Sequence, residues 1–212
     1  VLVGLLNVKY LIVGYDYAFG HGREGDGPFL QMQGQQYGFG VDILQPLGAD
    51  GSPYSSTRIR QLIAEGNVRD VVDLLGRHYT FEGKVVPGEQ RGRGLGFPTA
   101  NLITEKEQLP ADGVYAVKVQ CREQEYAGVV NIGRRPTFGG GAPTIEVHLL
   151  DFTGDLYGEF LRLYFVEHLR EEQSFNGPAE LKTAINADIL RSRQLLESTH
   201  VVQYQEYLGH SE

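Results

Sequence analysis

The first fifty residues alternate short apolar runs with polar, glycine-containing segments. An apolar run at residues 11–13 leads into "GYDYAFGHGREGDGP", which is typical of a loop. The stretch "FLQMQGQQYGF" then predicts a short helix, and "GVDILQPL" predicts a second strand. The order strand, helix, strand favours α/β structure with parallel pairing.

Two helices are predicted next. In "SSTRIRQLIAEG", Ile59, Leu62 and Ile63 form an i, i+3, i+4 apolar stripe after a serine that can cap the helix, and Gly66 fits its end. A second amphipathic segment runs from Asn67 to Gly76, with the asparagine at a capping position and the glycine at the stop. The sequence therefore predicts a helical hairpin before residue 77.

After Gly76 the pattern changes to short β-rich runs separated by turn-rich segments. Short strands at even spacing are typical of a small antiparallel barrel or sandwich. A final helix is predicted from Pro178, with Leu181, Ala184, Ile185 and Ile189 along one face. We place a domain boundary at this change, which gives domains 1–76 and 77–212. The five predicted runs are residues 79–87, 113–120, 127–132, 144–152 and 160–166.

Composition narrows the class of protein. The chain has 212 residues, 41% apolar and 22% charged, which is enough to bury a substantial core. Its apolar runs fall far short of the roughly 20 residues that span a bilayer, so we expect a soluble, cytoplasmic protein without a membrane partner. The chain starts at Val1 and lacks the marks of a signal peptide. The opening residues instead predict a domain whose front half is missing.

The net charge of −8 is spread unevenly. Residues 1–76 hold five basic and eight acidic residues, residues 77–150 nine and eight, and residues 151–212 five and eleven. This distribution disfavours an extended nucleic-acid surface and leaves room for one small anionic ligand. Cys121 is the only cysteine, which excludes an intrachain disulfide framework, and the six histidines show no metal-ligand spacing.

The segment "RGRGLGFPTAN", residues 91–101, is rich in glycine but matches neither a P-loop nor a dinucleotide fingerprint. Its glycines would let backbone N–H groups approach an anion, and Arg91 and Arg93 would add charge, although a plain turn is the alternative. At its end, Thr99 and Asn101 point to the same side of an extended strand. Their oxygens are ligands that Mg²⁺ accepts alongside substrate phosphates.

A phosphoryl transfer to an alcohol also needs a group that takes the hydroxyl proton. In "TIEVHLLDF" the alternation puts Glu146 and His148 on the face opposite the apolar residues. Glu146 is then a candidate base, with an ordinary solvent-facing position as the alternative. Arg170 and Phe175 follow a strand, and the phenyl ring could lie against a flat aromatic substrate; a solvated loop is the alternative.

Several motifs together carry a resemblance that covers nearly the whole chain. "GRGLGFPTAN", "GVYAV", "VNIGRRPTF", "IEVHLLDFTGDLYG" and "LREEQSF", in this order, resemble the riboflavin kinase family. Upstream, "GYDYAFGHGREGD" and "YSSTRIRQLIAEGNVRDVVDLLGR" resemble the back half of the FMN adenylyltransferase domain of bacterial bifunctional riboflavin kinase/FAD synthetases. The resemblance implies a partial Rossmann-like nucleotidyl transferase domain, followed by a six-stranded Greek-key barrel with a C-terminal helix.

The resemblance also implies an activity, the transfer of the γ-phosphate of MgATP to the 5′-hydroxyl of riboflavin to give FMN. It implies Glu146 as the catalytic base, Thr99 and Asn101 as ligands of Mg²⁺ and ATP, and Arg170 and Phe175 as flavin contacts. The positions that match further ATP contacts are Lys84, Gly88, Gly92, Gly94, Gly96, Pro98, Leu149, Asp151 and Tyr157.

In the N-terminal portion, four residues match a second phosphate-binding signature at a helix start: Ser55, Ser56, Thr57 and Arg58. The H-x-G-H motif of related nucleotidyl transferases does not occur in these 212 residues. We therefore expect a full-length parent to make FAD and this chain not to.

Two hypotheses of other classes stay open at this point. A small β-barrel could be a binding module for RNA or protein without catalysis, although the near-neutral charge of residues 77–150 argues against it. The chain could also be a folded fragment without activity.

Overall fold

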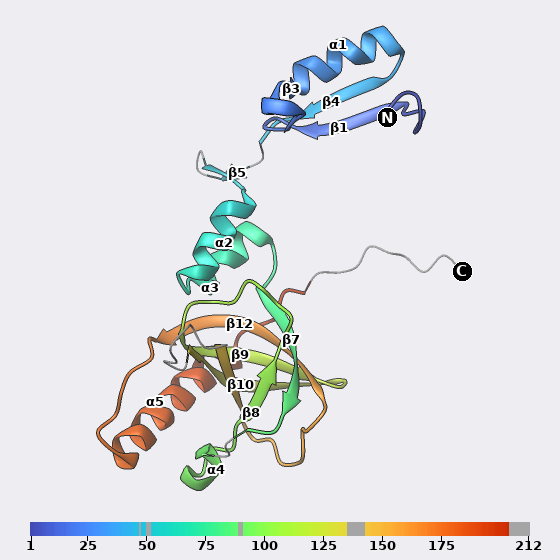
Figure 1. The fold of residues 1–212 in the computed structure, drawn as a ribbon. Coiled ribbons are helices and arrows are strands. Elements are labelled where there is room, and N and C mark those ends of the chain that lie inside the picture. Colours follow the sequence, from blue (N-terminus) through green and yellow to red (C-terminus); the bar gives the residue numbers. More distant parts are fainter. Residues whose placement is uncertain (47, 50–51, 89–90, 135–142, 204–212) are drawn as a thin grey trace. The chain divides into compact units, whose positions relative to one another are not determined.

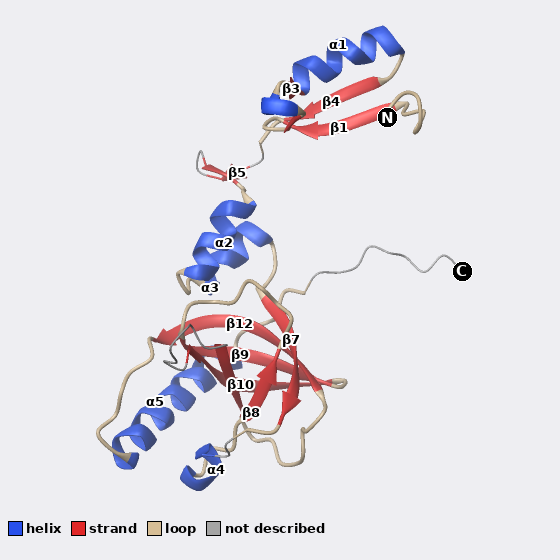
Figure 2. Ribbon diagram, viewed as in Figure 1, coloured by secondary structure: helices blue, strands red, loops and turns tan. Residues whose placement is uncertain are grey.

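The computed structural model describes residues 1–46, 48–49, 52–88, 91–134 and 143–203, and its elements are drawn in Figures 1 and 2. The chain divides into two compact units, residues 1–55 and 56–212. Within the described residues, no helix has the length and apolar character needed to cross a membrane.

The first unit is a small α/β portion. Strands β1 (Tyr10–Gly14) and β4 (Gly40–Leu44) pair in parallel, with α1 (Gly27–Tyr37) between them in the chain. The Asp26 carboxylate caps α1 by accepting a hydrogen bond of 2.8 Å from the backbone N–H of Phe29. The predicted strand, helix and parallel strand are thus confirmed. The remaining elements of the unit are β2 (Ala18–Phe19), a 3₁₀ turn (His21–Arg23), β3 (Gly25–Asp26), β5 (Gly48–Ala49) and β6 (Ser52–Pro53).

The second unit begins with the predicted helical hairpin, α2 (Ser56–Ala64) and α3 (Val68–Leu75). Helix α3 ends at Gly76, whose φ of 68° lies in the left-handed region that favours glycine. Ile63, Val68 and Val71 are buried in the same cluster as the barrel core. The hairpin therefore packs with the barrel, whereas the sequence grouped residues 56–76 with the N-terminal domain. The domain boundary at residue 77 stays a prediction.

Six strands close into a barrel in the order β10-β11-β8-β7-β12-β9, with antiparallel pairing throughout. Strands β9, β10 and β11 are consecutive neighbours, and the preceding strand β8 lies beside β11, which is a Greek-key arrangement. The fold expected from the resemblance is confirmed. The strands are β7 (Thr80–Val86), β8 (Ala100–Ile103), β9 (Gly113–Cys121), β10 (Gln124–Arg134), β11 (Pro143–Leu149) and β12 (Phe160–Arg170).

The barrel interior is filled by the apolar residues that alternate with outward-facing polar ones. In β11, Ile145 and Val147 are buried, while Glu146 and His148 are only half-buried. A second apolar cluster lies outside the barrel, where Val114 and Leu169 pack with Leu196 of α5 (Pro178–Glu197). This cluster fixes the long helix against β9, β10 and β12, and Figure 2 shows α5 alongside the strands.

Candidate active site

Three polar residues lie in one row on the outside of the barrel. Glu146 of β11 is the register partner of Asn131 on β10 and of Asn101 on β8. Neighbouring strands are about 4.8 Å apart, so the row is close to two strand spacings wide. Side chains alternate along a strand, and Ile145 and Val147 are buried inside the barrel, so Glu146 between them points outward. The sequence predicted the outward face of Glu146 but not which residues would lie beside it, because register is a property of strand pairing.

This row lines a cavity of about 550 Å³. Helix α5 supplies an apolar part of the wall through Leu181, Ile185 and Ile189. No described residue hydrogen-bonds to or forms an ion pair with the Glu146 carboxylate, whereas its neighbour Asn131 donates a hydrogen bond of 3.1 Å to Glu172. Glu146 is thus a half-buried carboxylate with open acceptor positions, facing a cavity.

A second cavity, of about 580 Å³, begins at Thr99. Thr99 lines both cavities, so the two spaces share this residue in their walls. Three residues predicted to contact a nucleotide, Pro98, Leu149 and Tyr157, line this second cavity. The structure therefore places several predicted nucleotide contacts in a cavity next to the Glu146 row, with Thr99 in the walls of both cavities.

His148 holds the segment just before β8, which contains Thr99. Its Nδ1 atom lies 2.8 Å from the carbonyl oxygen of Pro98, and because a carbonyl can only accept, Nδ1 carries the proton of this bond. The ring also packs edge-on against Phe97, with 6.0 Å between centroids. His148 thus fixes the residues just before Thr99.

The glycine-rich segment forms a short helix, α4 (Arg91–Leu95), where the sequence indicated a loop. Gly92, Leu95 and Phe97 line the cavity that contains Glu146. A methyl group at Gly92 would lie 2.4 Å from the Phe97 carbonyl oxygen, and one at Gly88 would lie 2.1 Å from the Asn101 amide nitrogen. These two glycines permit close packing around the site. Gly94 and Gly96 have no such neighbours, and the side chains of Arg91 and Arg93 lie outside the described residues.

The two charged residues among the predicted nucleotide contacts, Lys84 and Asp151, do not line these cavities. Lys84 lines a separate cavity of about 850 Å³ on the outer face of β7, between its register partners Phe160 and Ile103. That cavity is larger but contains none of the row, so we place the candidate site by the chemistry of its lining. Asp151 forms hydrogen bonds of 2.6 and 2.7 Å with Arg193, and this partner holds the pKa of its carboxyl below the usual range.

The four residues of the second phosphate-binding signature lie at the start of α2. Ser56, Thr57 and Arg58 occupy its exposed first turn, directly after the half-buried Ser55. None of them lines the cavities described above. Their predicted role at a nucleotide stays a prediction.

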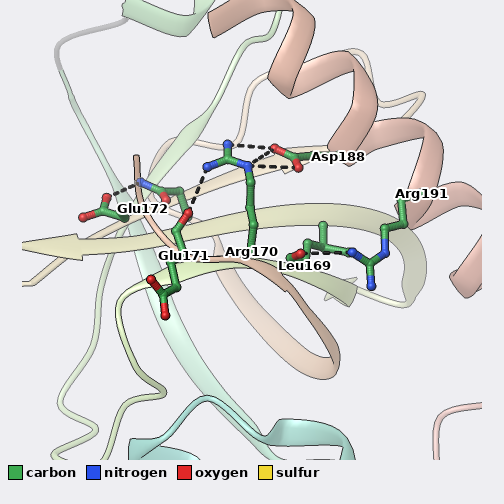
Figure 3. Close-up of polar contacts among 7 residues, drawn as sticks. Leu169, Arg170, Glu171, Glu172, Asp188 and Arg191 are labelled. Atoms are coloured by element: carbon green, nitrogen blue, oxygen red, sulfur yellow. Dashed lines mark hydrogen bonds and ion pairs between the residues drawn. The ribbon is translucent and has the colours of Figure 1, made fainter. Parts of the chain in front are cut away.

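Arg170 and Phe175 lie in the wall of the Glu146 cavity. The centre of the Arg170 guanidinium group is 5.6 Å from the Phe175 ring centroid, within the range of a cation–π contact. The same guanidinium group binds Asp188 of α5, with the shortest contact at 2.9 Å. Figure 3 shows this pair at the end of β12.

Sequence reasoning missed two acidic residues of this wall, Glu172 and Asp188. Asp188 carried a signal, because it lies three residues after Ile185 and just before Ile189, within the apolar face predicted for the last helix. An acidic residue in such a stripe indicates a buried partner. Glu172, in an exposed loop, gave no comparable signal.

Two family models match the chain. The one described as "Riboflavin kinase" matches residues 75–196, and the one described as "FAD synthetase" matches residues 1–58. The first match covers more than half of the chain and contains the whole barrel.

Curated relatives agree with these matches. The bifunctional riboflavin kinase/FMN adenylyltransferase of Pseudomonas fluorescens is 45% identical over 196 residues, which cover 92% of this chain and 63% of the relative. The protein of the same name from Escherichia coli is 43% identical over 199 residues, covering 93% and 64%. The chain thus spans slightly less than two thirds of the length of these relatives.

A solved structure from Streptococcus pneumoniae, described as a macrolide-efflux protein, is similar in fold. It has a TM-score of 0.80 and 35% sequence identity, and the match covers 89% of this chain and 61% of the other. The efflux role is part of the name of that protein alone. For this chain, the comparison shows the fold.

Proposed function

Because this chain belongs to the riboflavin kinase family, we propose that it transfers the γ-phosphate of ATP to the 5′-hydroxyl of riboflavin, giving FMN and ADP. The observation that carries the proposal is that two cavities share Thr99 in their walls, beside a row that contains a carboxylate without a partner among the described residues. A bisubstrate phosphoryl transfer requires two binding spaces that share one reacting point.

The two cavities differ in the substrates they suit. The Glu146 cavity has apolar side chains of α5 on one wall and the Phe175 ring on another, which fits a flat aromatic ring system such as that of riboflavin. The cavity lined by Leu149 and Tyr157 opens on the other side of Thr99 and is the proposed place of ATP.

Glu146 is the proposed general base. Its carboxylate accepts the proton of the riboflavin hydroxyl as that oxygen forms a bond to the terminal phosphorus of ATP, and the bond from phosphorus to the departing ADP oxygen breaks. A carboxylate already bound to a cation would be a weaker base. The open acceptor positions of Glu146 therefore suit this role.

The residues near Thr99 fit a magnesium ion that arrives with the nucleotide. Within the described part of the chain, no group of three or more histidine, cysteine or acidic side chains is arranged to hold a metal ion. Thr99 and Asn101 offer two neutral oxygens beside the Glu146 cavity, and Thr99 also lines the cavity proposed for ATP. Two such oxygens match the preference of Mg²⁺ for a few protein ligands completed by phosphates and water. When bound, the metal neutralises charge on the phosphates, while Thr99 and Asn101 would orient it.

The FAD synthetase match over residues 1–58 favours a second activity for a longer chain. We propose that such a chain adenylylates FMN to FAD, using the residues from Ser55 to Arg58 at the nucleotide. From the 212 residues themselves we expect FMN and no FAD, because they lack the H-x-G-H motif that meets the ATP phosphates in related enzymes.

Product analysis tests the proposal. The purified chain is incubated with riboflavin, ATP and Mg²⁺, and flavins and nucleotides are separated by chromatography. We expect one FMN and one ADP for each riboflavin consumed. Riboflavin that remains unchanged in the presence of a folded chain would overturn the proposed activity.

A further inference from the structure

Asp188 is a buried carboxylate on α5, where it shares the buried face of the helix with Ser192 and Leu196. It is 8% exposed, and the neighbouring Ile185 and Ile189 line the Glu146 cavity with it. Burial of a charged carboxylate is unfavourable unless the charge is paired and hydrogen-bonded. The position of Asp188 therefore depends on its partner.

That partner is Arg170, and the contact fixes the plane of the guanidinium group. Nε donates to both carboxylate oxygens of Asp188, each at 3.1 Å, and Nη2 donates to one of them at 2.9 Å. On its other side, Nη1 donates to the backbone carbonyl of Glu171 at 3.1 Å. All three nitrogens are thus held, and two of the five N–H groups of an arginine are left for a ligand.

The same helix is tied to the end of β12 at a second point. Arg191 donates a hydrogen bond of 3.0 Å to the carbonyl of Leu169, the residue before Arg170. Figure 3 shows both contacts between α5 and the strand end. Because the two contacts are three residues apart on α5, they oppose sliding of the helix along β12 as well as separation of the helix from the strand.

We propose that Asp188 is a positioning residue for flavin recognition, an inference that rests on the proposed function. Asp188 holds the Arg170 guanidinium in one plane beside Phe175 and neutralises its charge. A neutralised planar group with two N–H donors suits the carbonyl oxygens of an uncharged flavin ring. It suits a phosphate less well, because a phosphate attracts a free cation.

A purely structural role is the alternative that the test must separate. On the same helix, Arg193 forms a comparable pair with the exposed Asp151, and neither residue lines either cavity. If the Arg170 pair only held α5 in place, loss of Asp188 would lower stability and disturb the binding of both substrates. A positioning role predicts a selective loss of riboflavin binding that acts through Arg170.

A double-mutant cycle tests the proposal in the 212-residue chain. The variants are Asp188→Asn, Arg170→Gln and the double substitution, and the readouts are the riboflavin Kd from flavin fluorescence and the KM for ATP. We expect each single variant to weaken riboflavin binding by about tenfold, the scale of one lost charge-assisted hydrogen bond. The KM for ATP should stay within about twofold, and the double variant should bind riboflavin as the Arg170→Gln variant does.

Three results would overturn the proposal: a riboflavin Kd unchanged in Asp188→Asn, equal effects on riboflavin and ATP, or additive effects in the double variant. Glu197→Gln, on the exposed last turn of α5, is the matched control and should leave all values unchanged.

A replacement variant and riboflavin binding by the wild-type chain distinguish the remaining outcomes. If Asp188→Asn fails to fold, as circular dichroism would show, Arg170→Lys replaces it, because lysine keeps the charge but lacks the planar fork. Unchanged riboflavin binding in that variant would also overturn the proposal. A wild-type chain that binds no riboflavin would instead contradict the proposed function.

Discussion

Among the ionisable side chains that line the Glu146 cavity, Glu146 itself differs by having no partner among the described residues. His148, two residues further along β11, is bound to the Pro98 carbonyl, and Asn131 on the next strand is bound to Glu172. Arg170 is held by Asp188. The partnered residues therefore shape the cavity, and the carboxylate between them is the group able to accept a proton.

A single substitution at Thr99 should change the KM for one substrate and leave the KM for the other nearly unchanged. Thr99→Ala removes one hydroxyl oxygen at the junction of the cavities, so we expect the KM for MgATP to rise by about tenfold. The KM for riboflavin should change little. Steady-state kinetics at varied ATP checks this, with the exposed Thr183→Ala as control. An unchanged KM for ATP would remove Thr99 from the nucleotide site.

At the scale of elements, α5 is the wall on which the Glu146 cavity depends. It is fixed by the cluster that contains Leu196, Val114 and Leu169, and by the polar contacts at the end of β12. The cavity therefore keeps its shape only while the helix stays docked.

Leu196 and Leu190 provide a matched pair for testing this docking, because the first is 2% exposed and the second is 60% exposed on the same helix. Leu196→Ala should lower the free energy of unfolding by about 2–5 kcal/mol, since it leaves a cavity in packed surroundings. Leu190→Ala should change it by no more than about 0.5 kcal/mol. Urea unfolding followed by circular dichroism gives both values, and equal effects would contradict the docking role.

Most helices and strands could be predicted from the sequence, because apolar residues recur with a period of two in strands and of 3.6 in helices. Strand β8 was not among the five predicted β-rich runs, since it has four residues and includes the polar Asn101, and only the motif analysis placed Thr99 and Asn101 in an extended strand. Helix α4 was not predicted either, because glycines disfavour helices and its formation depends on tertiary packing. The row of Asn131, Glu146 and Asn101 could not be predicted at all without the strand register.

At the scale of the whole molecule, the compact unit that contains the candidate site begins at residue 56. Helices α2 and α3 contribute buried side chains to its core, and the backbone N–H of Ala111 donates to the carbonyl of Ile63 at 3.2 Å. Residues 56–76 thus support the barrel although the riboflavin kinase match begins only at residue 75.

Two shortened chains test the contribution of this hairpin. We expect residues 56–212 to unfold cooperatively and to keep the proposed activity. Residues 77–212 should be clearly less stable, because each buried valine or isoleucine of the hairpin contributes about 1.5–3 kcal/mol. Thermal unfolding of the two shortened chains under the same conditions tests this expectation. Equal melting temperatures would show that the hairpin does not stabilise the barrel.

The most direct test of the account is the rate of FMN formation by Glu146→Gln. Glutamine keeps the size of the side chain and removes its ability to accept a proton, so we predict that kcat falls by about 10²–10⁴-fold while both KM values stay near those of the wild type. Glu107→Gln, an exposed position outside the cavities described, should keep full activity. A Glu146→Gln variant that forms FMN at the wild-type rate would contradict the account.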